Sequence, residues 1–519
     1  MRRTLRHLRH LRAIVATLAR EDALFFADQV PNLPGPLRLF LKIVRRPAAR
    51  PPVPGRPGQR LARALSKLGP FFIKFGQSLA TRSDLLGEEI ADDLAELQDR
   101  LTPFPGDLAR AIVAAELGRP LGELYEVFDN VPVAAASIAQ VHFAITTDGR
   151  EVAVKILRPD IEAAFARDLD LLLWLAQWIE RVAPSTRRLK PVEVIGTFAE
   201  TVRMEMDLRL EGAAAAELKE NFAADPDFKV PAVDWERTAR GVLTIERVSG
   251  HRIDDLAGLS ATGHDPDLIL AKSAQAFFRQ VFRDGFFHAD MHPGNMFVTE
   301  DGALAPVDFG IMGRLDRATR IFLAEMLGGF LRGDYREVAA VHFRAGYVPK
   351  HKSIEAFAQA CRAIGEPLLK KPLNEISVGR LMAQLFRVTE TFEMETQPQL
   401  LLLQKTMVVA EGVGRRLNPS VNMWQLAEPL IAEWMLENRG PAAQLGEAAG
   451  NITRALERIP RLLAEAEIVA LSLADGVRLH PETLRALQRG NSRRDRSQIA
   501  LWVAVLALTA AVVALAVGS

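Results

Sequence analysis

Residues 288–295 read His288-Ala289-Asp290-Met291-His292-Pro293-Gly294-Asn295, and Asp308-Phe309-Gly310 follows shortly after them. Asp290 and Asn295 lie five positions apart, and Glu300-Asp301-Gly302 predicts the turn of a short hairpin between the two motifs. Such a hairpin returns the chain, so we expect Asp308 to share a cleft with Asp290 and Asn295. Carboxylate and amide oxygens are hard ligands of the kind that Mg²⁺ prefers.

A strand predicted upstream of these motifs carries a lysine that could complement their carboxylates. Val152-Ala153-Val154-Lys155 predicts an apolar strand that ends in an amine. Kinase-type phosphoryl-transfer sites place one Asp beside the attacking hydroxyl, hold Mg²⁺ with an Asn and a second Asp, and contact the ATP phosphates with a strand Lys. Asp-Phe-Gly alone is a weak signal, but its distance from Asp290 and Asn295 makes the combination specific. Glu205, on the helix predicted next, is the expected ion-pair partner of Lys155.

The segment before this strand lacks the usual glycine-rich phosphate loop. In its place stand Ala134, Ala135, Ala136, Ser137, Ile138, Ala139, Gln140, Val141 and His142. Alanine carries a Cβ and does not take positive φ as freely as glycine, so this loop should cover a nucleotide with a different backbone path. A small-residue turn in a packed core is the alternative interpretation.

Composition excludes several classes of protein. The 519 residues include 65 Lys and Arg against 64 Asp and Glu, so the net charge of +1 gives no basis for nucleic-acid binding. The single cysteine, Cys361, excludes an internal disulfide and a cysteine-rich zinc site, and it fits a reducing compartment. With 49% apolar and 25% charged residues, the chain has the composition of a globular protein.

Both ends of the chain carry patterns that suggest a membrane. Residues 1–20 contain six Arg and no acidic residue, with apolar residues at three- and four-residue steps. This pattern predicts a basic amphipathic helix that lies on an anionic membrane, docks on the protein body or serves as a presequence. Residues 499–517 carry no charge, and a helix of this length spans about 28 Å at ~1.5 Å per residue, close to the hydrocarbon core.

Four arginines, Arg489, Arg493, Arg494 and Arg496, precede this tail. The positive-inside bias therefore predicts a cytoplasmic body and one outward-threaded transmembrane helix, with a buried core helix as the alternative.

Proline-rich stretches, turn signals and changes in hydrophobic periodicity predict six regions along the chain. They are 1–58, an amphipathic helix and Pro-rich linker; 59–130, a helical extension; 131–250, a small mixed lobe; 251–440, a larger helical lobe; 441–498, a helical region; and 499–517, the transmembrane helix.

Taken together, the motifs resemble those of the UbiB family of atypical kinase-like proteins, which includes the ADCK proteins. Lys74-Phe75-Gly76-Gln77 resembles its KxGQ signature, residues 134–142 its alanine-rich loop, and Glu205-Met206-Asp207 with Glu211 its ExD segment. The resemblance covers about residues 60–430. Ser83 and Gly87 depart from it, because the family pattern leads us to expect Pro at both positions.

The resemblance implies an α+β, protein-kinase-like bilobal fold with a helical extension. It implies Asp290 as catalytic base, Asn295 and Asp308 as metal ligands, Lys155 with Glu205 as the ion pair at the phosphates, and residues 134–142 as the nucleotide loop. Lys74, close to Glu211, and Gln77 would belong to the extension that folds over the cleft.

The implied function is Mg²⁺-dependent ATP binding and phosphoryl transfer or hydrolysis in support of ubiquinone biosynthesis. The implied partners are ATP, a membrane lipid or polyprenylated quinone precursor, and other enzymes of that pathway, with no nucleic acid. The implied location is the inner (cytoplasmic) membrane, with a single pass.

Two other classes stay open on the sequence alone. His288, Asp290 and His292 alternate, and on an extended strand they would share one face as a two-His, one-carboxylate site for Fe(II). That arrangement would suit a quinone-pathway hydroxylase acting on a polyprenylphenol. A scaffold that binds nucleotide without turnover is the other alternative.

Overall fold

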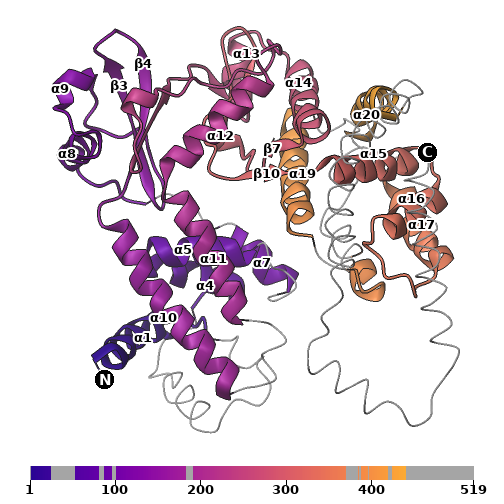
Figure 1. The fold of residues 1–519 in the computed structure, drawn as a ribbon, viewed down its shortest axis with the longest axis horizontal. Coiled ribbons are helices and arrows are strands. Elements are labelled where there is room, and N and C mark those ends of the chain that lie inside the picture. The colour runs from indigo at the N-terminus through magenta and orange to yellow at the C-terminus, as the bar shows by residue number, and fades with distance from the viewer. Residues whose placement is uncertain are drawn as a thin grey trace, which may run out of the picture. The chain divides into compact units, whose positions relative to one another are not determined.

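The computed structural model describes residues 2–24, 53–80, 87–95, 97, 101–182, 191–369, 384, 387–394, 397–418 and 423–439 (Figure 1). The chain divides into two compact units, Met1–Met435 and Leu436–Ser519. The elements below belong to the first unit, except that the last helix continues to Arg439. The region expected at 441–498 and the tail at 499–517 lie outside the described residues. Among the described helices, none combines the length and hydropathy needed to cross a bilayer.

An antiparallel sheet forms the small lobe. Its strands are β1 (Tyr125–Phe128), β2 (Ala134–Ala135), β3 (Ala139–Thr146), β4 (Glu151–Leu157) and β5 (Val242–Glu246). They run in the order β1-β3-β4-β5, and β2 pairs with β3. Because β1 belongs to this sheet, the lobe begins at Tyr125, ahead of the boundary expected at residue 131.

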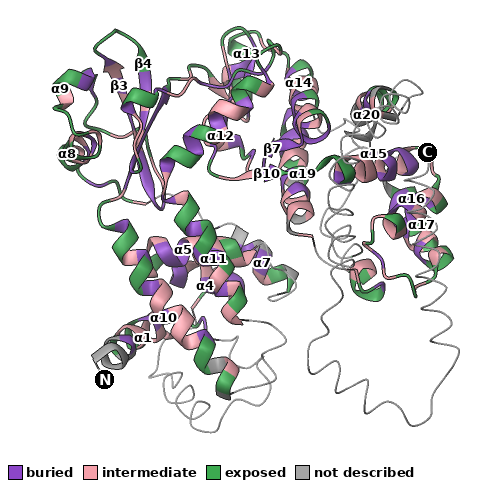
Figure 2. Ribbon diagram, in the orientation of Figure 1, coloured by how far each residue is buried: buried purple, intermediate pink, exposed green. Residues whose placement is uncertain are grey.

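Alternation along β4 decides which side chains face the core. Val152, Val154 and Ile156 are buried, and they pack under α8 (Gly106–Leu117) and α9 (Leu121–Leu124) in one apolar cluster (Figure 2). Successive side chains of a strand point to opposite faces, so Lys155 lies on the other face. The predicted strand is present and continues two residues beyond Lys155 to Leu157, and its alternation directs the amine away from the apolar core.

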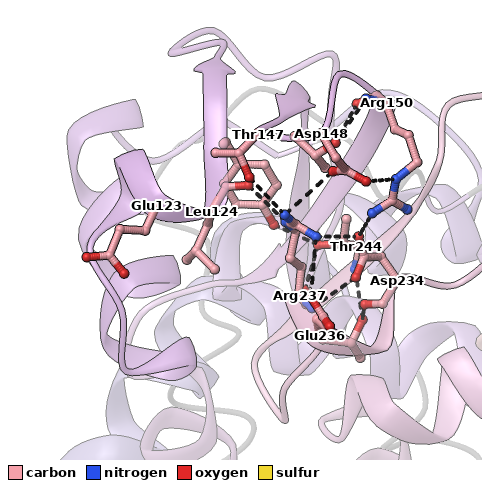
Figure 3. Close-up of polar contacts among 12 residues, drawn as sticks. Glu123, Leu124, Thr147, Asp148, Arg150, Asp234, Glu236, Arg237 and Thr244 are labelled. Carbon is pink, nitrogen blue, oxygen red and sulfur yellow. Dashed lines mark hydrogen bonds and ion pairs between the residues drawn. The ribbon is translucent and has the colours of Figure 1, made fainter.

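A buried polar network joins β1, β5 and the β3–β4 turn (Figure 3). Arg237, in the 3₁₀ helix η2 (Trp235–Arg237), donates to the Leu124 carbonyl at 2.8 Å and to Asp234 at 2.9 Å. The Tyr125 hydroxyl lies 2.8 Å from the Thr244 hydroxyl, and burial raises the pKa of Tyr125 to about 12. Because each buried polar group here has a partner, the network fixes this end of the sheet.

Three long helices lie between strands β4 and β5 in the chain: α10 (Ile161–Val182), α11 (Pro191–Glu205) and α12 (Leu208–Asn221). The sequence predicts helices across this region. The break between α11 and α12 falls at Met206-Asp207, where the Asp207 carboxylate accepts the Arg209 N–H and caps α12.

The helical extension packs on α10 and α11 through aromatic side chains. It comprises α4 (Pro57–Leu68), α5 (Pro70–Ala80) and α7 (Glu88–Ala95). The Phe71 ring of α5 lies 5.2 Å from Phe165 and 5.5 Å from Phe198 between ring centroids. A Cβ at Gly76 would come within 2.7 Å of the terminal Cδ1 atoms of Leu65 and Leu97, so a larger residue here would require both leucine side chains to move.

The N-terminal helix α1 (Arg2–Arg20) docks on the protein body. Ile14 and Leu18 are buried in the same cluster as the extension. On the polar side, His7 lies 2.9 Å from Asp170 and His10 lies 3.1 Å from Asp168. Its apolar face is therefore covered at these positions, which favours the docking interpretation over a membrane-surface helix.

The larger lobe is mainly helical, with short strands around the site. Its helices are α13 (Leu256–Ala261), α14 (Pro266–Phe278), η3 (Arg279–Asp284), η4 (Pro293–Asn295), α15 (Arg317–Leu331), α16 (Tyr335–Arg344), α17 (Ile354–Leu369), α19 (Pro398–Leu417) and α20 (Met423–Arg439). Its strands are β6 (His251–Arg252), β7 (Phe286–His288), β8 (Met296–Val298), β9 (Leu304–Pro306) and β10 (Met312–Arg314).

The hairpin predicted between the two motifs is present. Strand β8 pairs antiparallel with β9, and Gly302 has a φ of 76° in the turn between them. Positive φ suits glycine, which explains the Asp-Gly signal. On the other side of this hairpin, β7 pairs with β10, so the chain enters and leaves the motif region on neighbouring strands.

Candidate active site

Lys155 lies between two carboxylates from distant parts of the sequence. Its Nζ is 2.7 Å from Oε1 of Glu211 on α12 and 3.3 Å from Oδ2 of Asp308. Burial by itself would lower the pKa of Lys155, but the carboxylates of Asp308 and Glu211 outweigh it and raise that pKa. For Asp308, burial favours the neutral form, yet Lys155 and the Gly310 N–H hold the pKa below its ordinary value. Lys155 and Asp308 are therefore both ionised at neutral pH.

The expected ion pairs form with their partners exchanged. Glu205 does not pair with Lys155; it lies 3.0 Å from Nζ of Lys74 in the KxGQ segment, and Glu211 takes Lys155. The cause is the helix break before Asp207, since Glu205 ends α11 whereas Glu211 lies in the first turn of α12. The sequence predicts helical residues at both positions, but the change of direction between them has no periodic signal.

The Asp308-Phe309-Gly310 segment is fixed at three points. Phe309 is buried in the larger lobe's core, and its N–H donates to Oε1 of Glu211 at 3.3 Å. The Gly310 N–H donates to Oδ1 of Asp308 at 3.0 Å. Glu211 therefore contacts both the strand lysine and the backbone of this segment.

His288 joins the two motifs directly. Its Nε2–H donates to the Asp308 carbonyl, and its Nδ1 accepts the Asp290 N–H at 3.1 Å. Burial lowers the pKa of His288, although the nearby Asp308 and Asp290 carboxylates oppose that shift. The neutral Nε2–H tautomer satisfies both bonds, so this ring holds the backbone of Asp290 against that of Asp308.

Gln280 supports His288 from behind. Its Oε1 accepts the His288 N–H at 2.8 Å, and its side chain is fully buried. Gln280 belongs to η3, a π-helical turn of residues 279–284, a geometry frequently found at functional sites. The sequence does not reveal this residue, because one glutamine in an apolar helical stretch gives no signal of a π turn.

Asp290 keeps its carboxylate accessible. Its side chain is 34% exposed, and its backbone carbonyl accepts the Asn295 Nδ2–H at 3.4 Å. Oδ1 of Asp290 lies 3.5 Å from Nζ of Lys405 on α19. Lys405 was not among the predicted site residues, since it lies in a stretch that reads as a buried helix.

The donor set fits a magnesium ion. Asn295 donates through its amide nitrogen, which leaves the amide oxygen for a ligand role. Asp308 has two carboxylate oxygens with several lone pairs, and the Gly310 and Lys155 contacts use only part of that capacity. Oxygen ligands of this kind match the preference of Mg²⁺.

The alanine-rich loop forms a tight hairpin. Strand β2 pairs with β3, and the Ala136 N–H donates to the Ala139 carbonyl at 2.8 Å. Within it, Gln140 and His142 turn inward and are fully buried. Gln140 exchanges hydrogen bonds with the backbone of Phe104, and Nδ1 of His142 lies 2.7 Å from the Asp129 carbonyl. These two side chains hold the loop, so any contact with a nucleotide falls to the residues around them.

Gln77 acts within the extension. Its Nε2 donates to the Leu97 carbonyl at 3.2 Å, just beyond the end of α7. Together with the Lys74–Glu205 pair, this bond connects the KxGQ helix both to its own domain and to α11.

The iron-site alternative is not compatible with this geometry. Strand β7 ends at His288, so Asp290 and His292 do not continue it. Both ring nitrogens of His288 are engaged, and Nδ1 of His292 accepts the Gly294 N–H at 3.1 Å. Within the part of the chain that the structure describes, no three His, Cys, Asp or Glu side chains converge as a metal site.

The exchanged pairing predicts a specific energetic coupling. In a double-mutant cycle, Lys155→Met and Glu211→Gln should couple by about 1–3 kcal/mol, because the two side chains contact each other directly at a mostly buried position. Lys155→Met with Glu205→Gln is the matched control and should be additive within about 0.5 kcal/mol. Urea unfolding of the full chain gives both numbers, and an equal coupling for the control pair would contradict the observed partners.

The His288 contacts predict a pH dependence with a defined sign. Because burial lowers the pKa of His288, its contribution to stability is complete above the unfolded value of about 6.5 and is lost as the pH falls below it. The stability difference between the wild type and His288→Gln should therefore shrink between about pH 7.5 and 5.5. Burial also lowers the pKa of His142 and His342. Both residues are present in the wild type and in His288→Gln, so their contributions cancel in the difference between the two proteins. A stability difference between the two proteins that stays constant from about pH 7.5 to 5.5 would contradict the assignment of His288 as a neutral, hydrogen-bonded ring.

Comparison with known proteins agrees with this geometry. The model of the ABC1 atypical kinase-like domain matches residues 96–342, and the model of the UbiB helical domain matches residues 361–422. A probable protein kinase UbiB of Marinobacter nauticus is 41% identical over 435 residues, which cover 83% of this chain and 79% of the relative.

The corresponding protein of Pseudomonas fluorescens strain Pf0-1 is 41% identical over 464 residues, covering 88% and 85% of the two chains. Among solved structures, the Rv3197–erythromycin complex from Mycobacterium tuberculosis matches with a TM-score of 0.51 and 26% identity, covering 69% of this chain and 90% of that one. The kinase-like fold is thus confirmed, and the chain belongs to the UbiB family of atypical kinase-like proteins.

Proposed function

We propose that this protein binds Mg²⁺-ATP and transfers or hydrolyses its γ-phosphoryl group in support of ubiquinone biosynthesis. The observation that carries the proposal is the 3.3 Å contact between Lys155 on β4 and Asp308, which unites the strand lysine with the metal-binding motif. His288 then ties Asp308 to Asp290 through the backbone. A structural ion pair alone would not require an accessible Asp290 or an oxygen donor at Asn295.

The residues take distinct roles in this proposal. Asp308 and Asn295 would hold the magnesium ion, which neutralises phosphate charge when bound. Lys155 would contact the phosphates, with Glu211 holding its ammonium in place. Asp290 would accept the proton of the attacking oxygen, which suits its partly exposed carboxylate.

The extension supports an acceptor other than a folded protein. Lys74 approaches the site through Glu205, and its positive charge is among those that lower the pKa of Asp308. The KxGQ helix therefore lies within electrostatic range of the metal-binding motif. We propose that it restricts access to small acceptors, water among them.

The membrane and quinone parts of the proposal rest on other grounds. The names of the UbiB relatives support the pathway, and the uncharged stretch 499–517 supports a single-pass anchor in the inner membrane. Polyprenylated precursors lie in the bilayer, so an anchored ATPase would meet them there, beside the enzymes that modify them.

Replacement of the base tests the chemistry. Asp290→Asn should reduce Mg²⁺-dependent ATP hydrolysis by about 10²–10⁴-fold, because the amide cannot accept the proton. ATP affinity should change little, since the shape and the metal ligands remain. Steady-state phosphate release and equilibrium nucleotide binding measure the two effects. Undiminished hydrolysis would remove Asp290 from this role, and wild-type binding without any hydrolysis would favour the scaffold alternative.

Genetic complementation tests the pathway. Deletion of the gene should lower ubiquinone and accumulate a prenylated intermediate, measured by mass spectrometry of lipid extracts. The wild-type gene should restore the quinone, whereas Asp290→Asn expressed at the same level should not. Unchanged quinone and intermediates after deletion would contradict the pathway assignment without affecting the ATPase result.

A further inference from the structure

The loop that carries Asp290 supplies no available cation. Its two histidines are both engaged: His288 bridges Asp290 and Asp308, and Nδ1 of His292 accepts the Gly294 N–H. Lys155 is held by Glu211 and Asp308. Transfer of a γ-phosphoryl group places negative charge on oxygens near the attacking nucleophile, and fixed positive charge there accelerates the reaction.

Lys405 brings a cation to this position from a different element. Its Nζ lies 3.5 Å from Oδ1 of Asp290, and its side chain is 38% exposed. Neighbouring residues fix the helix: Leu403 is buried in the larger lobe's core, and the fully buried Thr406 donates its hydroxyl to the Leu402 carbonyl at 2.9 Å. The helix is therefore anchored on one side while Lys405 reaches the catalytic loop on another.

Stability alone does not explain this contact. An ion pair at 3.5 Å between two partly exposed side chains contributes little to folding, on the order of 0–1 kcal/mol. The same partial exposure leaves the ammonium group accessible to a phosphate oxygen. A lysine has three donors, so a bond to Asp290 leaves others for a second anion.

We propose that Lys405 contacts the γ-phosphoryl group of bound ATP and offsets its charge during transfer. In the step, the attacking oxygen forms a bond to the γ-phosphorus while its proton passes to Asp290. The bond between that phosphorus and the β,γ-bridging oxygen breaks, and its electron pair leaves with ADP. Lys405 keeps its protons throughout and supplies only charge and position. This inference rests on the proposed function.

The test compares nucleotides that differ only in the γ-phosphate. With Mg²⁺ present, Lys405→Gln should weaken binding of the non-hydrolysable β,γ-imido analogue of ATP by about tenfold, the loss of one modest charged contact. Binding of ADP should be unchanged, since ADP lacks the contacted group. The turnover number should fall by about 10²-fold, and Lys405→Arg should restore part of both losses because it keeps the charge.

Arg416→Gln is the matched control. Arg416 lies on the same helix and also forms an ion pair, 3.1 Å from Asp254, but away from the catalytic loop. This variant should retain wild-type turnover and the wild-type ratio of analogue to ADP affinity. Circular dichroism and thermal melting of all variants establish that each is folded, and Lys405→Arg keeps the test informative if the glutamine variant is not.

The outcomes separate this inference from the proposed function. Lower turnover of Lys405→Gln with an unchanged affinity ratio would mean that Lys405 only orients Asp290, and it would overturn the phosphate contact. Unchanged turnover and affinity would overturn it as well. If the wild-type protein bound no Mg²⁺-nucleotide, the proposed function itself would fail, a result visible before any variant is compared.

Discussion

The site depends on one partly buried ammonium group held between two carboxylates. Lys155 comes from the small lobe's sheet, Glu211 from the helix that follows the α11–α12 break, and Asp308 from the end of the larger lobe's hairpin. The side chains of Lys155 and Glu211 are 16% and 7% exposed, so loss of Lys155 would leave the Glu211 carboxylate largely shielded from water and without compensation. The contact therefore joins three chain segments only when all three are correctly placed, and it holds the charge that the proposed phosphate recognition would need.

A second set of contacts transmits this placement to the catalytic loop. Gln280 holds the backbone of His288, and His288 holds those of Asp290 and Asp308. The hydrogen bonds are directional and at least partly buried, so a shift of one motif would break bonds to the other. Asp290, the proposed base, thus gains its position from backbone contacts while its side chain stays partly exposed.

Local sequence patterns predicted the elements and the convergence of Lys155 with Asp308, but not every partner. The apolar pattern of β4 was sufficient to predict this strand, and the Asp-Gly turn was sufficient to predict the antiparallel β8–β9 hairpin. The exchange of Glu205 and Glu211 was not predictable from periodicity, because the Asp207 cap redirects the chain between two helical segments. Lys405 and Gln280 were missed for a related reason: their roles come from tertiary packing of apolar helices, which has no short-range motif.

The charges around the site also bear on the order in which ligands bind. Three lysines (Lys74, Lys155 and Lys405) form ion pairs with four carboxylates (Glu205, Glu211, Asp290 and Asp308), so the acidic groups exceed the basic ones by one. An acidic excess attracts a divalent cation and opposes a free triphosphate, particularly where burial weakens solvent screening. Each lysine is already engaged by a carboxylate, so a phosphate must compete for it. Under the proposed function, a magnesium ion held by Asp308 would neutralise the carboxylate that Lys155 contacts at 3.3 Å and would leave Glu211 as the remaining partner of the ammonium. The proposed function would therefore favour ATP as its magnesium complex over the free anion.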